Sequence, residues 1–319
     1  MKSYTIQDYV SSKAEEWNEF VEDSNNGTVF HRQDFLSYHP EGRFARDDKL
    51  VYEGRKLVAV LPLSYEAAGD GSKVGRSPYG ASFGGVVHKE LSAKRAHILI
   101  SCLRERLKAD GYSMLHACFP PACYWKACDS TVEYVLLKEV KHRCVGSSLT
   151  SVIELHNRLT SQSYRRSSRG AQKAGVTVQR SSDIDTFYEL LCETIVEKHG
   201  SQITHTREEL KLLLDLLGDR LQIFLGMYGG KAISGVLVFE NASPCAMAFY
   251  NGHRQEFADL NSLNMVLDHV VACFAADKNF LDLGTTDAFD ASYNWGLFQF
   301  KEGAGGRGYC RNYYEFCLD

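Results

Sequence analysis

Two segments of this chain repeat one pattern, a short strand, a glycine turn and an apolar strand. The first copy runs over residues 50–63 and the second over residues 225–239. When Tyr52 is aligned with Tyr228, the glycines of the two turns coincide, and so do the basic residues that follow them. Strand residues around a glycine turn are typical of a β-hairpin. The sequence therefore predicts the same hairpin in two places.

Each hairpin is followed by more strand-like sequence, an amphipathic helix and a further strand. The helices are expected over residues 93–109 and 262–276. In the second helix apolar residues recur at intervals of three and four, the pattern of one buried helix face. Agreement in both sequence and order favours duplication over chance. We expect an α/β (α+β) chain with domains at residues 1–150 and 151–319.

The segment that opens the second half, residues 161–178, is basic. Arg165, Arg169 and Lys173 share one face of the predicted helix, and Arg166 flanks them. Such a stripe is usually a solvated helix surface. Arginine also binds phosphate through two parallel hydrogen bonds, so a phosphate site is the other interpretation.

An apolar strand beginning at Phe280 ends near Gly284 and is followed by Lys301 beside two phenylalanines. Strand ends often carry sites, and a lysine that emerges from an apolar wall is a strong counter-charge for an anionic group. A snorkelling surface lysine is the alternative and, from the residues alone, the favoured one.

Composition excludes several classes of protein. The chain has 319 residues, 44% of them hydrophobic, and a net charge of −4, which argues against a general nucleic-acid coat. No apolar run reaches the roughly 20 residues of a membrane span, and residues 1–9 lack a secretory signal. The ten cysteines are scattered, and the spacing of Cys118, Cys123 and Cys128 matches no common zinc site. We expect a cytoplasmic protein with buried, reduced thiols and no metal.

The order of these segments resembles the FemABX-like branch of the GNAT acyltransferases. The resemblance rests on the duplicated unit, the basic helix before the strand Gly175–Val178, the strand Ala248–Gly252 and the closing block 281–301. It covers nearly the whole chain and is firmest over residues 164–307. It implies tandem duplicated GNAT-like domains, each a mixed central sheet flanked by helices, with a cleft between them. The first domain would be degenerate, and the second would carry the acyltransferase site.

The resemblance also implies site residues. Lys301 would stabilise negative charge near the transferring carbonyl. Tyr250 would donate a proton from the splayed strand of the GNAT fold or, alternatively, be a half-buried aromatic residue of that strand. Asp282 would bind the amine or, alternatively, cap a turn. Substrate contacts are expected from Arg165, Arg166, Arg169, Thr285, Phe300 and Trp295.

The implied reaction transfers an acyl group to an amine of an amino sugar on a cell-envelope or polysaccharide precursor. Acyl-CoA is the expected donor, with no permanently bound cofactor. Conventional GNAT proteins hold the CoA pyrophosphate with a glycine-containing loop, whereas residues 253–262 contain no glycine. Arg254, Asn261 and Ser262 are therefore the expected donor contacts.

Two other functions stay open. One is an aminoacyl-tRNA-dependent transferase of the peptidoglycan-bridge type, which the basic helix would support. The other is a non-catalytic ligand-binding module that has kept the cleft but lost the catalytic activity. A phosphate-binding lysine of the bridge enzymes would fall near Tyr38 or His39, so a different envelope sugar is favoured as acceptor. His199 is either a base or a helix cap. DNA is not an expected partner. The inner face of the membrane is an alternative location to the cytoplasm. The oligomeric state is open.

Overall fold

The computed structural model describes residues 4–40, 42–197, 202–287 and 293–318. The chain divides into two compact units, Met1–Ser147 with Arg311–Asp319, and Ser148–Cys310. The predicted domains place residues 311–319 with the second unit. In the structure they belong to the first, because strand β14 (Gly306–Cys317) leaves the second unit and pairs with β7 (Tyr112–Cys118).

The first unit carries two sheets, a four-stranded one in the order β1-β2-β3-β6 and a second in the order β4-β5-β7-β14. Its strands are β1 (Tyr4–Asp8), β2 (Lys49–Glu53), β3 (Lys56–Leu61), β4 (Ser64–Ala67), β5 (Lys73–Arg76), β6 (Val87–His88) and β7. Its α-helices are α1 (Ala14–Asp23), α2 (Gln33–Leu36), α3 (Ala93–Ala109) and α4 (Thr131–Glu139), and its 3-10 helices are η1 (Ser11–Lys13), η2 (Val29–His31) and η3 (Ala122–Tyr124).

Strands β2 and β3 are buried on both faces, which explains their nearly continuous apolar sequence. On one face Leu50 and Val60 pack with Trp17 of α1. On the other face Val51 and Ala59 pack in the cluster that contains the apolar side of α3.

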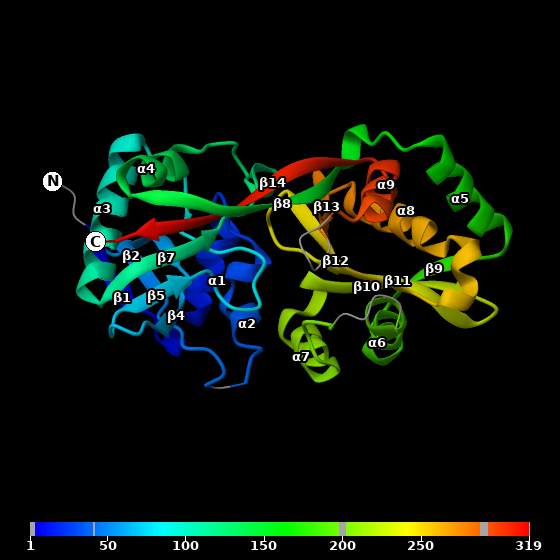
Figure 1. Ribbon diagram of the computed structural model, residues 1–319, viewed down its shortest axis with the longest axis horizontal. Helices are drawn as coiled ribbons and strands as arrows, with labels where there is room; N and C mark the ends of the chain where they lie inside the picture. Colours follow the sequence, from blue (N-terminus) through cyan, green and yellow to red (C-terminus); the bar gives the residue numbers. More distant parts are fainter. Residues whose placement is uncertain (1–3, 41, 198–201, 288–292, 319) are drawn as a thin grey trace. The chain divides into compact units, whose positions relative to one another are not determined.

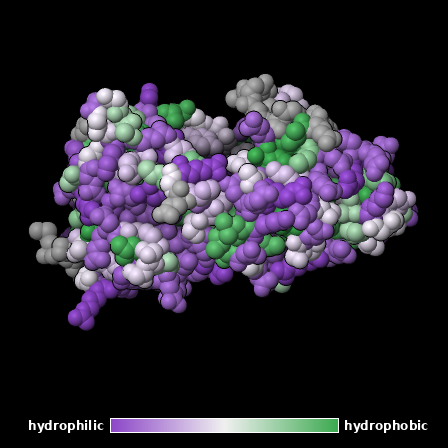
Figure 2. Space-filling model, turned by 90° about the horizontal axis from the view of Figure 1, so that it is seen from below, coloured by the Kyte–Doolittle hydropathy of each residue, from purple (hydrophilic) through white to green (hydrophobic). Residues whose placement is uncertain are grey.

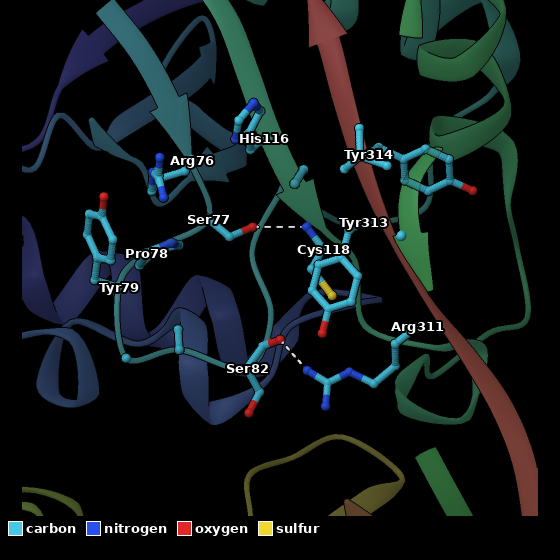
Figure 3. A pocket seen from close by; sticks show the side chains of 15 residues that line it. Arg76, Ser77, Pro78, Tyr79, Ser82, His116, Cys118, Arg311, Tyr313 and Tyr314 are labelled. Carbon is cyan, nitrogen blue, oxygen red and sulfur yellow. Dashed lines mark hydrogen bonds between the residues drawn. The ribbon is translucent and has the colours of Figure 1, made fainter. Parts of the chain in front are cut away.

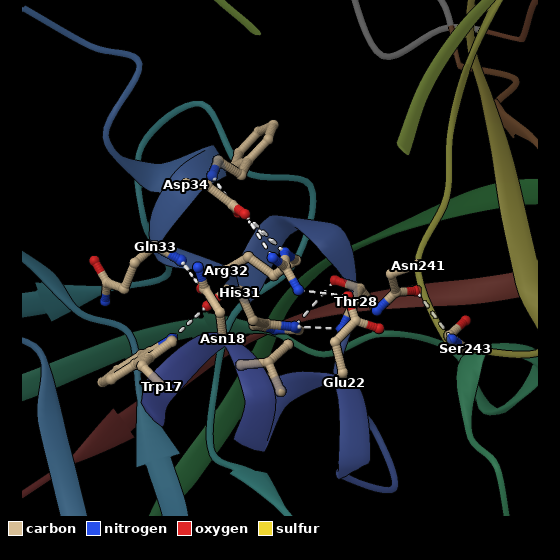
Figure 4. Close-up of polar contacts among 12 residues, drawn as sticks. Trp17, Asn18, Glu22, Thr28, His31, Arg32, Gln33, Asp34, Asn241 and Ser243 are labelled. Atoms are coloured by element: carbon tan, nitrogen blue, oxygen red, sulfur yellow. Dashed lines mark hydrogen bonds and ion pairs between the residues drawn. The ribbon is translucent and has the colours of Figure 1, made fainter. Parts of the chain in front are cut away.

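Polar contacts fix the segment between α1 and α2 (Figure 4). The Trp17 indole donates to the His31 carbonyl oxygen at 2.7 Å. The buried Arg32 guanidinium bonds Glu22 and Asp34. Burial lowers the pKa of His31 to about 4, so this imidazole is neutral at physiological pH.

The second unit is one sheet covered by helices on both faces. Its strands are β8 (His142–Glu154, which begins in the first unit), β9 (Thr177–Ser181), β10 (Leu221–Tyr228), β11 (Lys231–Phe239), β12 (Cys245–His253) and β13 (Phe280–Thr285), in the order β8-β13-β12-β11-β10-β9. Its helices are η4 (Leu155–Asn157), α5 (Gln162–Lys173), α6 (Ile184–Leu191), the π-helix η5 (Cys192–Glu197), α7 (Arg207–Leu217), η6 (Gly218–Arg220), η7 (Gln255–Leu260), α8 (Ser262–Phe274) and α9 (Trp295–Gly303). Figure 1 shows α5 and α8 on one side of the sheet, and α6 and α7 on the other.

The predicted duplication is confirmed. Strands β2 and β3 form a hairpin with Gly54 at a φ of 63°, and β10 and β11 form a hairpin whose two turn glycines also have positive φ. In each unit a strand that precedes the long helix pairs in parallel with the strand after it: β5 with β7 in the first unit, where the short strand β6 lies between β5 and α3 in the chain, and β12 with β13 in the second. The helices begin within one residue of the predicted positions.

The cysteines form no disulfide, and all ten lie in the described part of the chain. Cys118, Cys123 and Cys245 are buried, but four others are exposed, so burial was predicted too broadly. On the face in Figure 2 apolar residues form separate small patches among hydrophilic ones. Within the described ranges, no helix has the length and apolar character needed to cross a bilayer.

Candidate functional site

Strands β12 and β13 separate partway along the sheet. They pair in parallel only from Cys245 to Met247 and from Phe280 to Asp282. Beyond this point β12 continues along β11, with a bulge that leaves Phe249 between two register positions. The separation creates a gap in the sheet beside α8.

Lys301 of α9 occupies this gap. Its ammonium donates to the backbone oxygens of Gly284 at 2.9 Å and Thr285 at 2.6 Å. The side chain is 3% exposed, so the favoured prediction of a snorkelling surface lysine was wrong. Burial lowers the pKa of Lys301 to about 8, although Asp282 and Asp287 act in the opposite direction. At neutral pH the group is therefore mainly a cation.

Local sequence places this ammonium. The Asn294 side chain caps α9 by accepting from the Leu297 N–H at 3.0 Å, which fixes the start of the helix. At the other end of the contact, Gly284 has a φ of 76°, a conformation that favours glycine. This turn directs two consecutive carbonyl groups toward Lys301.

Asp282 makes the contacts of a turn cap. It is fully buried, and its Oδ1 accepts from the Gly284 N–H at 2.8 Å and from the Thr150 hydroxyl. Thr285, the other predicted residue of this strand end, contributes its carbonyl oxygen to Lys301. These contacts favour the capping alternative over a carboxylate that binds the amine.

Tyr250 lies on the opposite face of β12 from Lys301. Ala248 and Asn251 line the gap with Lys301, whereas the Tyr250 hydroxyl lies 2.9 Å from Nδ1 of the fully buried His205, just before α7. Burial raises the pKa of Tyr250 to about 12, so it is a neutral phenol. The structure therefore does not bring Tyr250 together with Lys301, and sequence analysis missed His205.

The predicted basic face of α5 is present. Arg165, Arg166, Arg169 and Lys173 are exposed and line an open hollow of about 510 Å³. Arg166 joins the other three rather than only flanking them. Within the described part of the chain, none of the four makes a hydrogen bond or ion pair. This distinguishes them from Arg158, which pairs with Asp268.

The predicted donor contacts are in different situations. The Arg254 guanidinium pairs with Glu189 and Glu193, so a phosphate would compete there with two carboxylates. Asn261 adopts a left-handed conformation, with a φ of 50°, immediately before α8, and Ser262 is buried. The sequence did not indicate these two glutamate partners of Arg254.

The two predicted aromatic contacts also differ. Phe300 packs against the core beside Tyr164 and lines the gap at Lys301. Trp295 is 65% exposed and stacks on Tyr293, with ring centroids 4.9 Å apart. His199 lies outside the described residues.

A larger cavity, of about 600 Å³, lies in the first unit (Figure 3). It opens where β5 and β7 separate, since Arg76 and His116 are their last paired residues. This is the position that the gap at Lys301 occupies in the second unit. Sequence analysis missed this cavity, although the duplication itself indicates where it lies.

Cations and aromatic rings line the cavity. Arg311 of β14 is 7% exposed, donates to the Ser82 carbonyl oxygen at 2.7 Å and lies over the Phe83 ring. Arg76 lies over the Tyr79 ring and pairs with Glu66. His39 and Tyr38, the positions discussed for a phosphate-binding lysine, lie against Gly80 of the cavity loop. The cavity is therefore suited to an anionic ligand.

Taken one at a time, the units share an antiparallel meander, a long helix and a parallel strand that separates from its neighbour. Two such units in one chain define the tandem GNAT fold. No family model and no curated protein matches the sequence. The chain is similar to the crystal structure of FemX, with 14% identity, coverage of 98% of this chain and 97% of that chain, and a TM-score of 0.75.

Two further solved structures resemble the chain. L-PGS from Bacillus licheniformis is 9% identical over 96% of this chain and 92% of that one, with a TM-score of 0.60. A tandem GNAT protein from the clavulanic acid biosynthesis pathway is 11% identical over 99% and 98%, with a TM-score of 0.50. The fold is that of the FemABX-like branch of the GNAT acyltransferases, as the sequence analysis predicts.

Proposed function

We propose that the protein transfers an acyl or aminoacyl group to an amine of a cell-envelope or polysaccharide precursor. The observation that carries this proposal is the Lys301 ammonium, buried in the gap between β12 and β13. A buried cation at a separated strand pair can stabilise charge that develops on a carbonyl oxygen. FemX and L-PGS share this fold. Their similarity to the chain supports an acceptor from the cell envelope only through the fold.

The proposed chemistry uses Lys301 as an electrostatic group. The acceptor nitrogen attacks the acyl carbon, and the carbonyl electrons move to the oxygen, where Lys301 stabilises them. Two of the three N–H donors of an ammonium are engaged by Gly284 and Thr285, which leaves one for the substrate. When the intermediate collapses, the bond to the donor breaks, and the leaving group takes up the proton that the amine loses.

One contrast favours aminoacyl-tRNA over acyl-CoA, the donor expected from the sequence. Arg254, the cation expected to bind the pyrophosphate, is engaged by two carboxylates. The basic face of α5 has no such partners within the described residues. Acyl-CoA remains the alternative donor.

A thermal-shift titration tests the donor. We expect aminoacyl-tRNA to raise the melting temperature and acetyl-CoA to leave it unchanged, because only a ligand of the folded state stabilises the protein. Uncharged tRNA and free CoA are the matched controls. A shift with CoA compounds alone would establish acyl-CoA as the donor. No shift with either, together with no transfer activity in the unmodified chain, would leave the ligand-binding module as the function.

The cavity of the first unit is proposed as the site for an anionic group of the acceptor. Arg76 and Arg311 line it, and Tyr79 and Tyr313 add aromatic surface for a sugar or base. Arginine binds diphosphate through paired hydrogen bonds. An acceptor linked to a nucleotide or lipid diphosphate fits this lining better than the exposed α5 face to which the sequence analysis assigns it.

Replacing Arg76 with methionine should weaken binding of a diphosphate sugar by about 10- to 100-fold, the value of one hydrogen bond to a charged group. The measurement is calorimetric titration with UDP-N-acetylglucosamine as the probe. Arg95→Met is the control, because Arg95 also pairs with a glutamate in this unit but does not line the cavity. An equal loss in both variants, or no loss in Arg76→Met, would contradict the assignment.

A further inference from the structure

We propose that a small cavity of the first unit, lined by residues of β6 and α4, binds the primary ammonium group of an alkylamine. This cavity shares no lining residue with the larger one at Arg76. The inference goes beyond the proposed transfer reaction and does not depend on it, because binding is measured without turnover.

The size and the charge of the cavity suit a small cation. Its volume is about 30 Å³, which exceeds the roughly 10–15 Å³ that a single water molecule needs. Its charged side chains are Asp129 and Glu133, and no lysine or arginine of the described residues lines it. Carboxylates without a basic neighbour in the same cavity favour a positively charged ligand.

Glu133 has no partner of its own. It is the third residue of α4 and is half-buried, and burial raises the pKa of its carboxyl group. Within the described residues, this carboxyl group makes no hydrogen bond and no ion pair. Glu139 of the same helix, in contrast, lies 2.6 Å from Nδ1 of His97. A partly buried carboxylate is costly without a donor, and an ammonium group would supply one.

His88 and Asp129 present two further acceptors. His88 is 5% exposed, and its Nδ1 donates to the Lys89 carbonyl oxygen at 2.9 Å. Burial lowers the pKa of His88, so the ring is neutral and its Nε2 is an acceptor, which has no partner in the described part of the chain. Asp129 accepts from the Thr131 N–H and hydroxyl through Oδ1 alone, which leaves Oδ2 for a ligand.

The lining therefore matches the donors of a primary ammonium group. Such a group has three N–H donors, and the cavity offers an imidazole nitrogen and two carboxylates. The rings of Phe119 and Trp125 also line it. The Trp125 N–H donates to the Pro120 carbonyl oxygen at 3.0 Å, so the indole is held by the protein and offers the ligand its ring. Aromatic rings attract a cation electrostatically.

An ammonium group fits these side chains better than a metal ion does. A bound zinc ion needs its nitrogen and oxygen ligands at about 2.0–2.2 Å, whereas an ammonium nitrogen lies about 2.8 Å from each acceptor. In the described part of the chain, no three side chains of histidine, cysteine, aspartate or glutamate are placed to hold a metal ion. The acceptors are thus arranged for the longer contacts.

A second cavity indicates what the ammonium group is attached to. It also has a volume of about 30 Å³, and it shares Val86, Phe119 and Leu136 with the first cavity. Apart from Gly85 and Arg104, its lining is wholly apolar. A hydrocarbon chain on the ammonium group would contact this apolar surface. Affinity should therefore rise from methylammonium to n-butylammonium, by up to about fourfold for each methylene group.

The test is a titration of the full chain, labelled with ¹⁵N, with n-butylammonium chloride as the probe. The chain has three tryptophans, and we expect only the indole signal of Trp125 to shift, because neither Trp17 nor Trp295 lines the cavity. Glu133→Gln should weaken binding by about 10- to 100-fold, the value of one hydrogen bond to a charged group. Glu139→Gln removes the same charge from the same helix outside the cavity and should leave the affinity unchanged.

Two matched probes separate charge from hydrogen bonding. n-Butanol has the chain without the charge, and tetramethylammonium has the charge without N–H donors, so each should bind at least about 10-fold more weakly than n-butylammonium. An unshifted Trp125 signal, equal effects of the two glutamate variants, or equal affinity for n-butanol would overturn the proposal. Equal affinity for tetramethylammonium would overturn the role of the three acceptors. A shift with zinc or magnesium chloride but not with n-butylammonium would make the cavity a metal site instead.

Discussion

Replacing Lys301 with methionine is expected to lower the rate of transfer by about 10²- to 10³-fold, the usual effect of removing a group that stabilises an oxyanion. Methionine keeps most of the apolar contacts of the side chain but removes the ammonium, with its charge and its hydrogen bonds to Gly284 and Thr285. Because the charge acts on the transition state, kcat should fall while donor affinity stays nearly constant. Single-turnover rates and donor titrations on the same preparation measure the two quantities.

The pH dependence of the unfolding free energy tests separately whether Lys301 is buried as a titrating group. The pKa of Lys301 is about 8 in the folded protein, against an ordinary value of 10.5. Between these values the unfolded chain holds a proton that the folded chain has lost, so stability rises with pH. The full cost of burying the ammonium is present below pH 8, and the rise amounts to about 3 kcal/mol.

Lys301→Met should lack this rise. The difference in unfolding free energy between the parent and the variant, measured from pH 7 to 11, isolates it from the other lysines and tyrosines. Parallel pH profiles would show that Lys301 is not buried as a titrating group. A full transfer rate in the same variant would remove Lys301 from the catalytic site.

The second large effect is expected at Asp282, where alanine should destabilise the second unit by about 3 kcal/mol. Its buried carboxylate accepts from the Gly284 N–H and the Thr150 hydroxyl, and each donor left without a partner costs about 1 to 3 kcal/mol. The corresponding fall in melting temperature is on the order of 10 °C. Thermal denaturation followed by near-UV circular dichroism measures it.

Asp282→Asn is the matched variant, because an amide oxygen still accepts these bonds but carries no charge. If Asp282 caps the turn, Asp282→Asn keeps most of the stability and most of the transfer rate. A stable Asp282→Asn protein whose rate falls about 100-fold would instead restore the carboxylate as the group that binds the amine.

Local patterns in the sequence predict much of this fold. The glycine turns, the apolar periodicity of α3 and α8, and the basic face of α5 each depend on residues within one or two turns of a helix or hairpin. Such features form from short-range geometry, so a single sequence is enough to place them. The strand end near Gly284 and the neighbouring lysine are of the same kind.

Contacts between distant segments could not be predicted in this way. The sequence favoured an exposed Lys301, but its ammonium is buried because the carbonyl groups of β13 are its acceptors. The sequence predicted an Arg254 free to bind the donor, but a glutamate from α6 and another from η5 pair with it in the structure. The cavity of the first unit requires Arg311, 235 positions after Arg76 in the printed numbering, to return on β14.

Tyr250 shows most clearly which features local sequence determines and which depend on the tertiary structure. Strict alternation along β12 places Tyr250 on the same face as Ala248, and thus beside Lys301. The bulge at Phe249 adds one residue, so that Ala248 and Asn251 share the face of the gap and Tyr250 turns to His205. The sequence alone determined which residues form strands and helices, because periodicity is local. Pairing with β11 decided which face each residue takes, because the register of a strand is set by its neighbour.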